Sequence, residues 1–80
     1  MIRISSREYE TLLKRGKIPE NEISIIVHNL VKLEEAGVSK DDLIGIIVHN
    51  IVKDVEFKRK FMRDPEDAAR SVGINPVPTP

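Results

Sequence analysis

The chain contains no cysteine and no tryptophan, and its 80 residues include only one tyrosine and two phenylalanines. Without cysteine, neither a disulfide nor a thiolate metal site can stabilise so short a chain, and nothing favours an oxidising compartment. A chain of this length buries only roughly 60 to 65% of its unfolded surface, so its core must be thin. Close helix packing or self-association therefore has to supply the remaining stability.

The chain also lacks net charge and long apolar runs. Thirteen basic residues balance thirteen acidic ones, which excludes the overall positive field of a dedicated nucleic-acid-binding protein. No run approaches the ~18 apolar residues that span a bilayer, and the first residues lack the apolar stretch of a signal peptide. The sequence therefore predicts a cytoplasmic protein that has no membrane partner.

Sequence motifs of catalysis are absent as well. There is no glycine-rich phosphate loop, no nucleophile elbow and no regular metal-ligand spacing. Acidic pairs do occur, but at expected helix starts and on solvated faces, where capping and solubility explain them. We therefore predict that the protein is not an enzyme and has no catalytic residue, no metal and no cofactor.

Residues that start and stop helices are well represented. Ser5 and Glu8 can form a capping box, Pro19 suits the first turn of a helix, and Gly37 can take the left-handed conformation that ends one. The residue before a proline is pushed out of helical geometry, so a helix should stop at Asp64. These signals predict an all-α fold, a small bundle of four helices over residues 5–16, 19–36, 39–63 and 65–73.

Ten residues of the second expected helix recur in the third. Residues 23–32 and 44–53 are identical at eight of ten positions. At 100° per residue, the apolar side chains of each copy share one face, which should form the core. These core positions are Ile23, Ile26, Val27, Leu30 and Leu33 in the first copy and Ile44, Ile47, Val48, Ile51 and Val55 in the second. We expect the two copies to form a central helical hairpin, in a single helical domain over 1–74 that precedes a proline-rich tail over 75–80.

Some residues of the repeat are not explained by that core. Ile25 and Ile46 point to nearly the opposite side, and Phe57 shares this side in the later copy. A monomeric amphipathic helix would carry polar residues there, so we predict a contact surface for a homodimer, a higher oligomer or another protein. The predicted interaction residues are Ile25, Ile46, His28, His49, Asn29, Asn50, Phe57 and Phe61.

The two histidines of the repeat, His28 and His49, lie on the shoulder of each copy. We interpret them as interfacial or half-exposed side chains bonded to a neighbour such as Asn29 or Asn50. Two sharper hypotheses are a metal site that a dimer completes and a pH-sensitive contact, because histidine titrates near neutrality. Neither copy has the His-x-x-x-His or Glu-x-x-His spacing of helical metal sites, which argues against the metal.

Basic residues cluster once, between the two phenylalanines and just after the second. The patch comprises Lys58, Arg59, Lys60 and Arg63. Two interpretations are open: a solvated helix face whose aromatic side chains point inward, or a contact for an acidic partner or nucleic acid.

The corner between the repeated helices, residues 33–43, resembles the turn of helix-turn-helix proteins, in which an Ala-Gly-Val-Ser-like segment precedes a recognition helix. That resemblance implies a DNA-binding protein. Here, however, the helix after the turn opens with Asp41 and Asp42, which would face phosphates, and continues into apolar residues that do not read bases.

A second resemblance covers residues 57–74. It is carried by Phe57, Phe61, Asp64-Pro65, Ala68-Ala69 and Gly73-Ile74. The segment is similar to the nitrile-hydratase-like and Nif11-like leaders of ribosomally made, modified peptides, in which an aromatic helix precedes Asp-Pro, an alanine-rich turn and Gly-Ile. The resemblance implies a helical segment that a modifying enzyme binds, with the modified core peptide after it. Here a short proline-rich tail follows, with Thr79 as its sole hydroxyl residue.

Three functional hypotheses follow from these features. The first is a non-catalytic helical interaction or adaptor protein that associates with itself and with another protein, and it depends on the apolar residues outside the core face. The alternatives are a leader-type precursor or substrate of a peptide-modifying enzyme and a helix-turn-helix DNA-binding protein, and each depends on one of the two resemblances.

Overall fold

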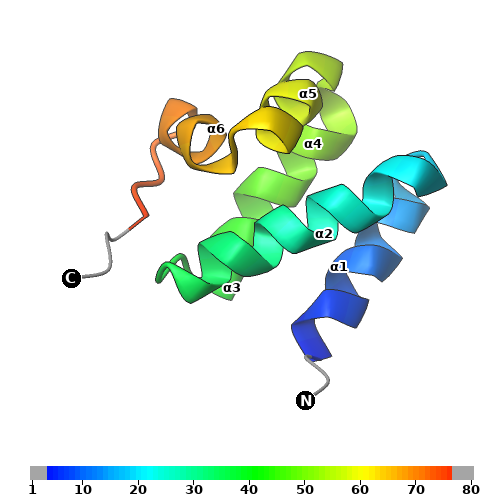
Figure 1. Ribbon diagram of the computed structural model, residues 1–80, viewed down its shortest axis with the longest axis horizontal. Coiled ribbons are helices and arrows are strands. Elements are labelled where there is room, and N and C mark those ends of the chain that lie inside the picture. The colour runs from blue at the N-terminus through cyan, green and yellow to red at the C-terminus, as the bar shows by residue number, and fades with distance from the viewer. Residues whose placement is uncertain (1–3, 77–80) are drawn as a thin grey trace.

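The computed structural model describes residues 4–76, and all regular structure in this range is helical (Figure 1). Its elements are α1 (Ile4–Arg15), α2 (Glu20–Glu35), α3 (Lys40–Asp42), the π-helix η1 (Leu43–Val48), α4 (His49–Lys53), α5 (Val55–Arg63) and α6 (Pro65–Ser71). Because α3, η1 and α4 follow one another without interruption, the described residues form five helical segments, where the sequence predicts four. The all-α prediction is confirmed. None of the described helices is long and apolar enough to cross a membrane.

One cluster of buried apolar side chains fills the space between the helices. Its members include seven of the predicted core residues: Ile23, Ile26, Leu30, Leu33, Ile47, Val48 and Ile51. Val27 and Ile44 are half-buried against this cluster. The assignment of Val55 to the core is wrong, because its side chain is 57% exposed.

The position of Val55 follows from a break in the predicted third helix. Asp54 has extended backbone dihedrals, φ −131° and ψ 108°, and its carboxylate accepts hydrogen bonds from the amides of Glu56 (3.0 Å) and Phe57 (3.3 Å). Asp54 is thus the N-cap of a new helix, α5. The change in direction turns Phe57 and Phe61 into the core, where they are 7% and 0% exposed.

This burial decides between two expectations for the phenylalanines. The placement of Phe57 on an exposed second face is wrong, because that placement assumed an unbroken helix through Asp54. The same burial removes Phe61 from the predicted interaction residues. The interpretation of the basic segment as a helix face whose aromatic side chains point inward is confirmed for both rings.

The two copies of the repeat share α1 and α5 as neighbours, and the first copy also contacts α6. In Figure 1, α2 lies between α1 on one side and the α5–α6 pair on the other, and its contacts are mainly with these three helices. The second copy contacts α1 through η1 and contacts α5 through α4. The copies meet at the tight corner over 36–39, but the core is completed by α1, α5 and α6 rather than by a hairpin of the two copies alone.

Two helix ends follow the sequence prediction closely. Gly37 (φ 97°) terminates α2 and Gly73 (φ 84°) terminates α6, each in the left-handed conformation. The next residues, Val38 and Ile74, are buried and donate their amides to carbonyls five residues earlier. This is the Schellman arrangement, which satisfies carbonyls that the helix itself leaves unpaired.

The end of α1 has the same arrangement with a different residue in the left-handed position. The helix ends at Arg15, and Lys17 (φ 63°) takes the conformation that a glycine usually supplies. Gly16 is required for space instead, because a Cβ at this position would lie 2.5 Å from Cγ2 of Val52. The glycine thus allows α1 to approach α4 closely.

The predicted capping box at the start of α1 is not formed as expected. The helix already includes Ser5, so this residue is not its N-cap, and its side chain lies outside the described residues. Glu8 forms an ion pair with Lys40 instead, which joins α1 to the start of α3. The hydroxyl of the next residue, Tyr9, donates to Oε1 of Glu34 near the end of α2 (3.0 Å), and burial together with this bond raises the pKa of Tyr9.

Candidate interaction surface

The two isoleucines predicted to lie outside the core are exposed. Ile25 on α2 is 46% exposed and Ile46 on η1 is 36% exposed. Both α2 and η1 pack against α1, and they have little direct contact with each other. Ile25 is one turn from Glu22 and one turn from Asn29, which both contact α5, so it lies on the side of α2 that faces this helix.

The histidines and asparagines of the repeat are separated by the fold. His28 and His49 are exposed, and both asparagine amides donate to backbone carbonyls. Asn29 is buried and donates to the carbonyls of Phe61 (2.9 Å) and Met62 (3.4 Å), so it caps the C-terminal end of α5 from a neighbouring helix. No group of three or more histidine, aspartate or glutamate residues within 4–76 could hold a metal ion.

Asn50 occupies the equivalent position of the second copy but is partly exposed and bonds within its own helix. Its amide donates to the Ile46 carbonyl at 2.7 Å. This carbonyl belongs to η1, the π-helical turn, whereas the first copy is a regular α-helix. Nearly identical decapeptides therefore place the same amide in a tertiary contact in one copy and in a local contact in the other.

The predicted basic patch divides into two neutralised and two free cations. Lys58 pairs with Glu22 of α2 at 2.7 Å, and both side chains are largely buried. Lys60 pairs with Asp67 of α6 at 3.3 Å. Arg59 and Arg63 are exposed and have no carboxylate partner among residues 4–76.

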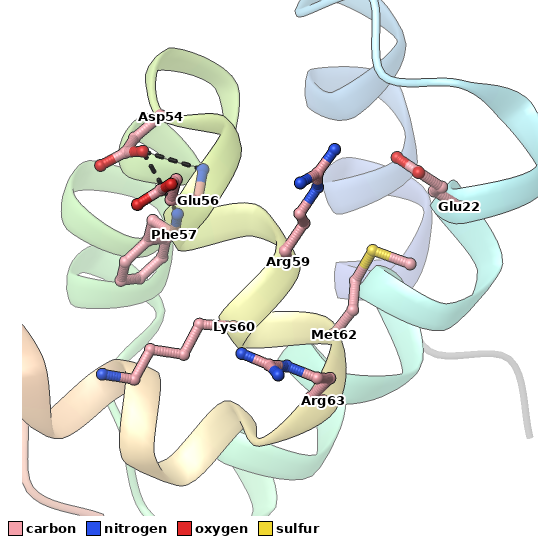
Figure 2. Close-up of a pocket in the computed structure, with 8 residues that line it drawn as sticks. All are labelled: Glu22, Asp54, Glu56, Phe57, Arg59, Lys60, Met62 and Arg63. Atoms are coloured by element: carbon pink, nitrogen blue, oxygen red, sulfur yellow. Dashed lines mark hydrogen bonds between the residues drawn. The ribbon is translucent and has the colours of Figure 1, made fainter.

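An open groove of about 770 Å³ runs along the outer side of α5 (Figure 2). The carboxylates of Asp54 and Glu56 lie at its N-terminal end and the guanidinium of Arg63 lies toward the other end, with Arg59 between them. Half-buried Met62 contributes apolar surface to the same groove. The side chains that line this groove can therefore form ion pairs with cations and with anions, and Met62 can make apolar contacts.

Sequence reasoning missed the acidic end of this groove. It treated residues 54–56 as the interior of a long helix, because the apolar spacing of the repeat continues to Val55. The available signal was Asp54, since aspartate is a preferred N-cap and Glu56 favours the first turn of a new helix.

A second, smaller groove of about 480 Å³ lies between α1 and η1. Half-buried Leu12 and Ile44 provide its apolar surface, and the exposed cations Arg7 and Arg15 flank it along α1. Neither arginine has a carboxylate partner among the residues that the structure describes. The residues of this groove are not among the sequence-predicted sites.

The corner that resembles a helix-turn-helix is formed as a tight turn. Ser39 caps α3 by accepting from the Asp42 amide at 3.2 Å, and Leu33 is fully buried beneath the turn. Asp41 and Asp42 are exposed at the start of the helix that would face DNA. The chain matches no family model, and no curated protein and no solved structure is significantly similar to it.

Proposed function

We propose that the protein is a non-catalytic helical interaction protein that associates with itself and docks a second protein. The observation that carries this proposal is that Ile25, Ile46 and Val55 remain on the surface although the core beneath them is closed. Burying such side chains against another chain is favourable by roughly 25 cal/mol per Å² of apolar surface. A small domain with a thin core gains a large fraction of its stability in this way.

The two grooves suit an adaptor because they are separate and differ in charge. The α5 groove carries exposed groups of both signs. In the α1–η1 groove the one carboxylate, Glu8, is paired with Lys40, whereas Arg7 and Arg15 have no carboxylate partner among residues 4–76. Such a groove favours a protein segment that presents carboxylates next to an apolar side chain. The second protein is therefore expected to dock there through an acidic segment, with an affinity that falls as salt is added.

Self-association is measured by sedimentation velocity over a range of micromolar concentrations. We expect a reversible monomer–dimer equilibrium, in which the weight-average sedimentation coefficient rises with concentration, because part of the exposed apolar surface becomes buried in the dimer. A chain that sediments as a monomer over the whole range would contradict the proposal.

A second candidate function, a leader-type substrate of a peptide-modifying enzyme, is favoured by the form of residues 57–74. In this segment α5 ends at Arg63, and the next residue, Asp64, caps α6 by accepting from the Asp67 amide (3.1 Å). Gly73 then terminates α6 in the left-handed conformation. Because Phe57 and Phe61 are buried, an enzyme would have to read the outer side of this unit.

The intact mass of the protein from its native cell tests this candidate. If it is a modified precursor, the mass should differ from that of the encoded chain by a modification or by cleavage beyond Gly73. An unchanged mass in cells that grow under several conditions would exclude it in favour of the interaction protein.

A further inference from the structure

The outer face of α5 presents a set of side chains that are exposed among the residues that the structure describes. At 100° per residue, Val55, Glu56, Arg59 and Arg63 fall within an arc of about 100°, opposite the buried rings of the helix. All four are exposed, and Val55 is the most exposed large apolar side chain of the described residues. Half-buried Met62 borders this arc. We refer to these five residues as the α5 face.

Charge is ordered along this face. Glu56 stands at its N-terminal end and Arg63 at its C-terminal end, and neither forms an ion pair with any residue in 4–76. The two side chains are seven residues apart, about 10.5 Å along the helix axis, so they are not partners within one chain. Of the other cations of α5, Lys58 is paired with Glu22 and Lys60 with Asp67, whereas Arg59 has no ion pair with any residue in 4–76.

A helix face that is acidic at one end and basic at the other is complementary to its own copy in antiparallel orientation. A two-fold axis near Arg59 brings Glu56 of each copy opposite Arg63 of the other. The same axis brings Val55 of each copy within a turn of the other copy's Met62. Two-fold dimers use one surface patch on both subunits, and this is the commonest form of soluble oligomer.

We propose that the α5 face is the interface of a two-fold dimer, in which two α5 helices pack antiparallel and Glu56 of each copy pairs with Arg63 of the other. The inference rests on the self-association proposed above and names the surface responsible for it. Four residues of the α5 face, Glu56, Arg59, Met62 and Arg63, also line the open groove along α5. Exposed Ile25 lies on the side of α2 that faces α5.

The size of this face sets the expected strength of the dimer. Nine residues of helix are about 13 Å long, which is less than a standard interface of ~800 Å² per partner requires. Arg59 also lies near the axis, so the two copies of Arg59 approach each other and repel. Each long Arg59 side chain can also reach the Glu56 carboxylate of the other copy. We therefore expect a micromolar dissociation constant that increases with salt.

Charge reversal tests the pairing directly. Glu56→Arg and Arg63→Glu should each weaken the dimer at least about tenfold, because each creates two like-charge contacts per dimer. The double variant, with both reversals in one chain, restores opposite charges at both contacts and should dimerise again. An equimolar mixture of the two single variants should form heterodimers, although each variant alone is mainly monomeric. Sedimentation velocity and native mass spectrometry measure these states.

Matched variants exclude a general effect of charge. Arg15→Glu makes the same change in charge as Arg63→Glu, but on α1, and should leave the dimer unchanged. Both α5 reversals also oppose the helix dipole, so circular dichroism is recorded to show that each variant is folded. If every variant dimerises like the original chain, or if the double variant and the mixture remain monomeric, the α5 interface is wrong.

A further variant separates failure of this inference from failure of the proposed function. Ile46→Glu places a charge on η1, away from the α5 face, and should not affect the dimer. If Ile46→Glu abolishes dimerisation while the α5 reversals do not, self-association stands and its surface is elsewhere. If the original chain is monomeric at all concentrations, both proposals are overturned.

Discussion

Replacing Asn29 by alanine is expected to destabilise the fold by about 1–3 kcal/mol relative to the same replacement of Asn50. The Asn29 amide is the donor for the carbonyls of Phe61 and Met62 at the end of α5, and the site is buried. Without this donor, buried carbonyls at a helix end lose a partner that water does not readily replace. Asn50 bonds at a partly exposed position, where water can substitute for its amide.

The internal repeat makes this an unusually well-controlled comparison. Both asparagines lie in the sequence Val-His-Asn, and replacement by alanine brings a similar gain in helix propensity at both positions. The difference between the two variants therefore isolates the tertiary hydrogen bonds. Urea unfolding followed by circular dichroism gives the free energies. Equal unfolding free energies for Asn29→Ala and Asn50→Ala would show that the contact with α5 contributes no net stability.

Gly16→Ala is expected to cost about 1–3 kcal/mol, although alanine is normally the better helix residue. The added methyl group would lie 2.5 Å from Cγ2 of Val52 and 2.9 Å from Cγ1, so α1 and α4 must separate or Val52 must move. Gly45→Ala is the matched control. No atom lies within 4 Å of a Cβ at this exposed helical position, so the change should stabilise the chain by up to about 1 kcal/mol.

A double-mutant cycle identifies the clash as the cause. Val52→Ala removes the two methyl groups that obstruct the Gly16 Cβ, so Gly16→Ala should cost much less in the Val52→Ala background than in the original chain. The four unfolding free energies are measured in urea under the same conditions. Additive costs would show that the close approach of α1 to α4 does not limit the size of residue 16.

Several features of the fold could be predicted because their causes lie within a few residues. Gly37 and Gly73 end helices because glycine takes the left-handed conformation at little cost, and Asp64 before Pro65 both stops α5 and caps α6. The apolar spacing of the first repeat predicted Ile23, Ile26, Leu30 and Leu33 as core residues because a regular helix keeps its phase.

The wrong predictions arise where a break in a helix changes the direction of all the residues that follow it. Asp54 begins a new helix, so the phase of the second repeat does not extend to Val55, Phe57 or Phe61. Apolar periodicity alone therefore predicts the wrong helix face for Val55, Phe57 and Phe61. The α5 face could not be predicted for the same reason, since the sequence pattern assigns its most exposed apolar residue, Val55, to the core.

The sequence also does not predict which charged residues form ion pairs with each other. Lys58, Arg59, Lys60 and Arg63 read as one basic patch, but two of the four are neutralised by Glu22 and Asp67, which lie on other helices. Which cation finds a carboxylate depends on helix packing, and the charge that remains for a partner is known only after the packing is known.

The sequence by itself determined the helical class, most helix ends and the core face of the first repeat, because caps, glycines and apolar periodicity act over one or two turns. The tertiary structure decided what the repeated residues do. Two decapeptides with eight identical residues carry almost the same local information, yet Asn29 caps a neighbouring helix while Asn50 bonds within its own. The tertiary position of each copy accounts for this difference, because Asn29 faces the C-terminal end of α5 whereas Asn50 reaches only a carbonyl of η1. The same packing leaves Glu56 and Arg63 without an ion-pair partner among residues 4–76.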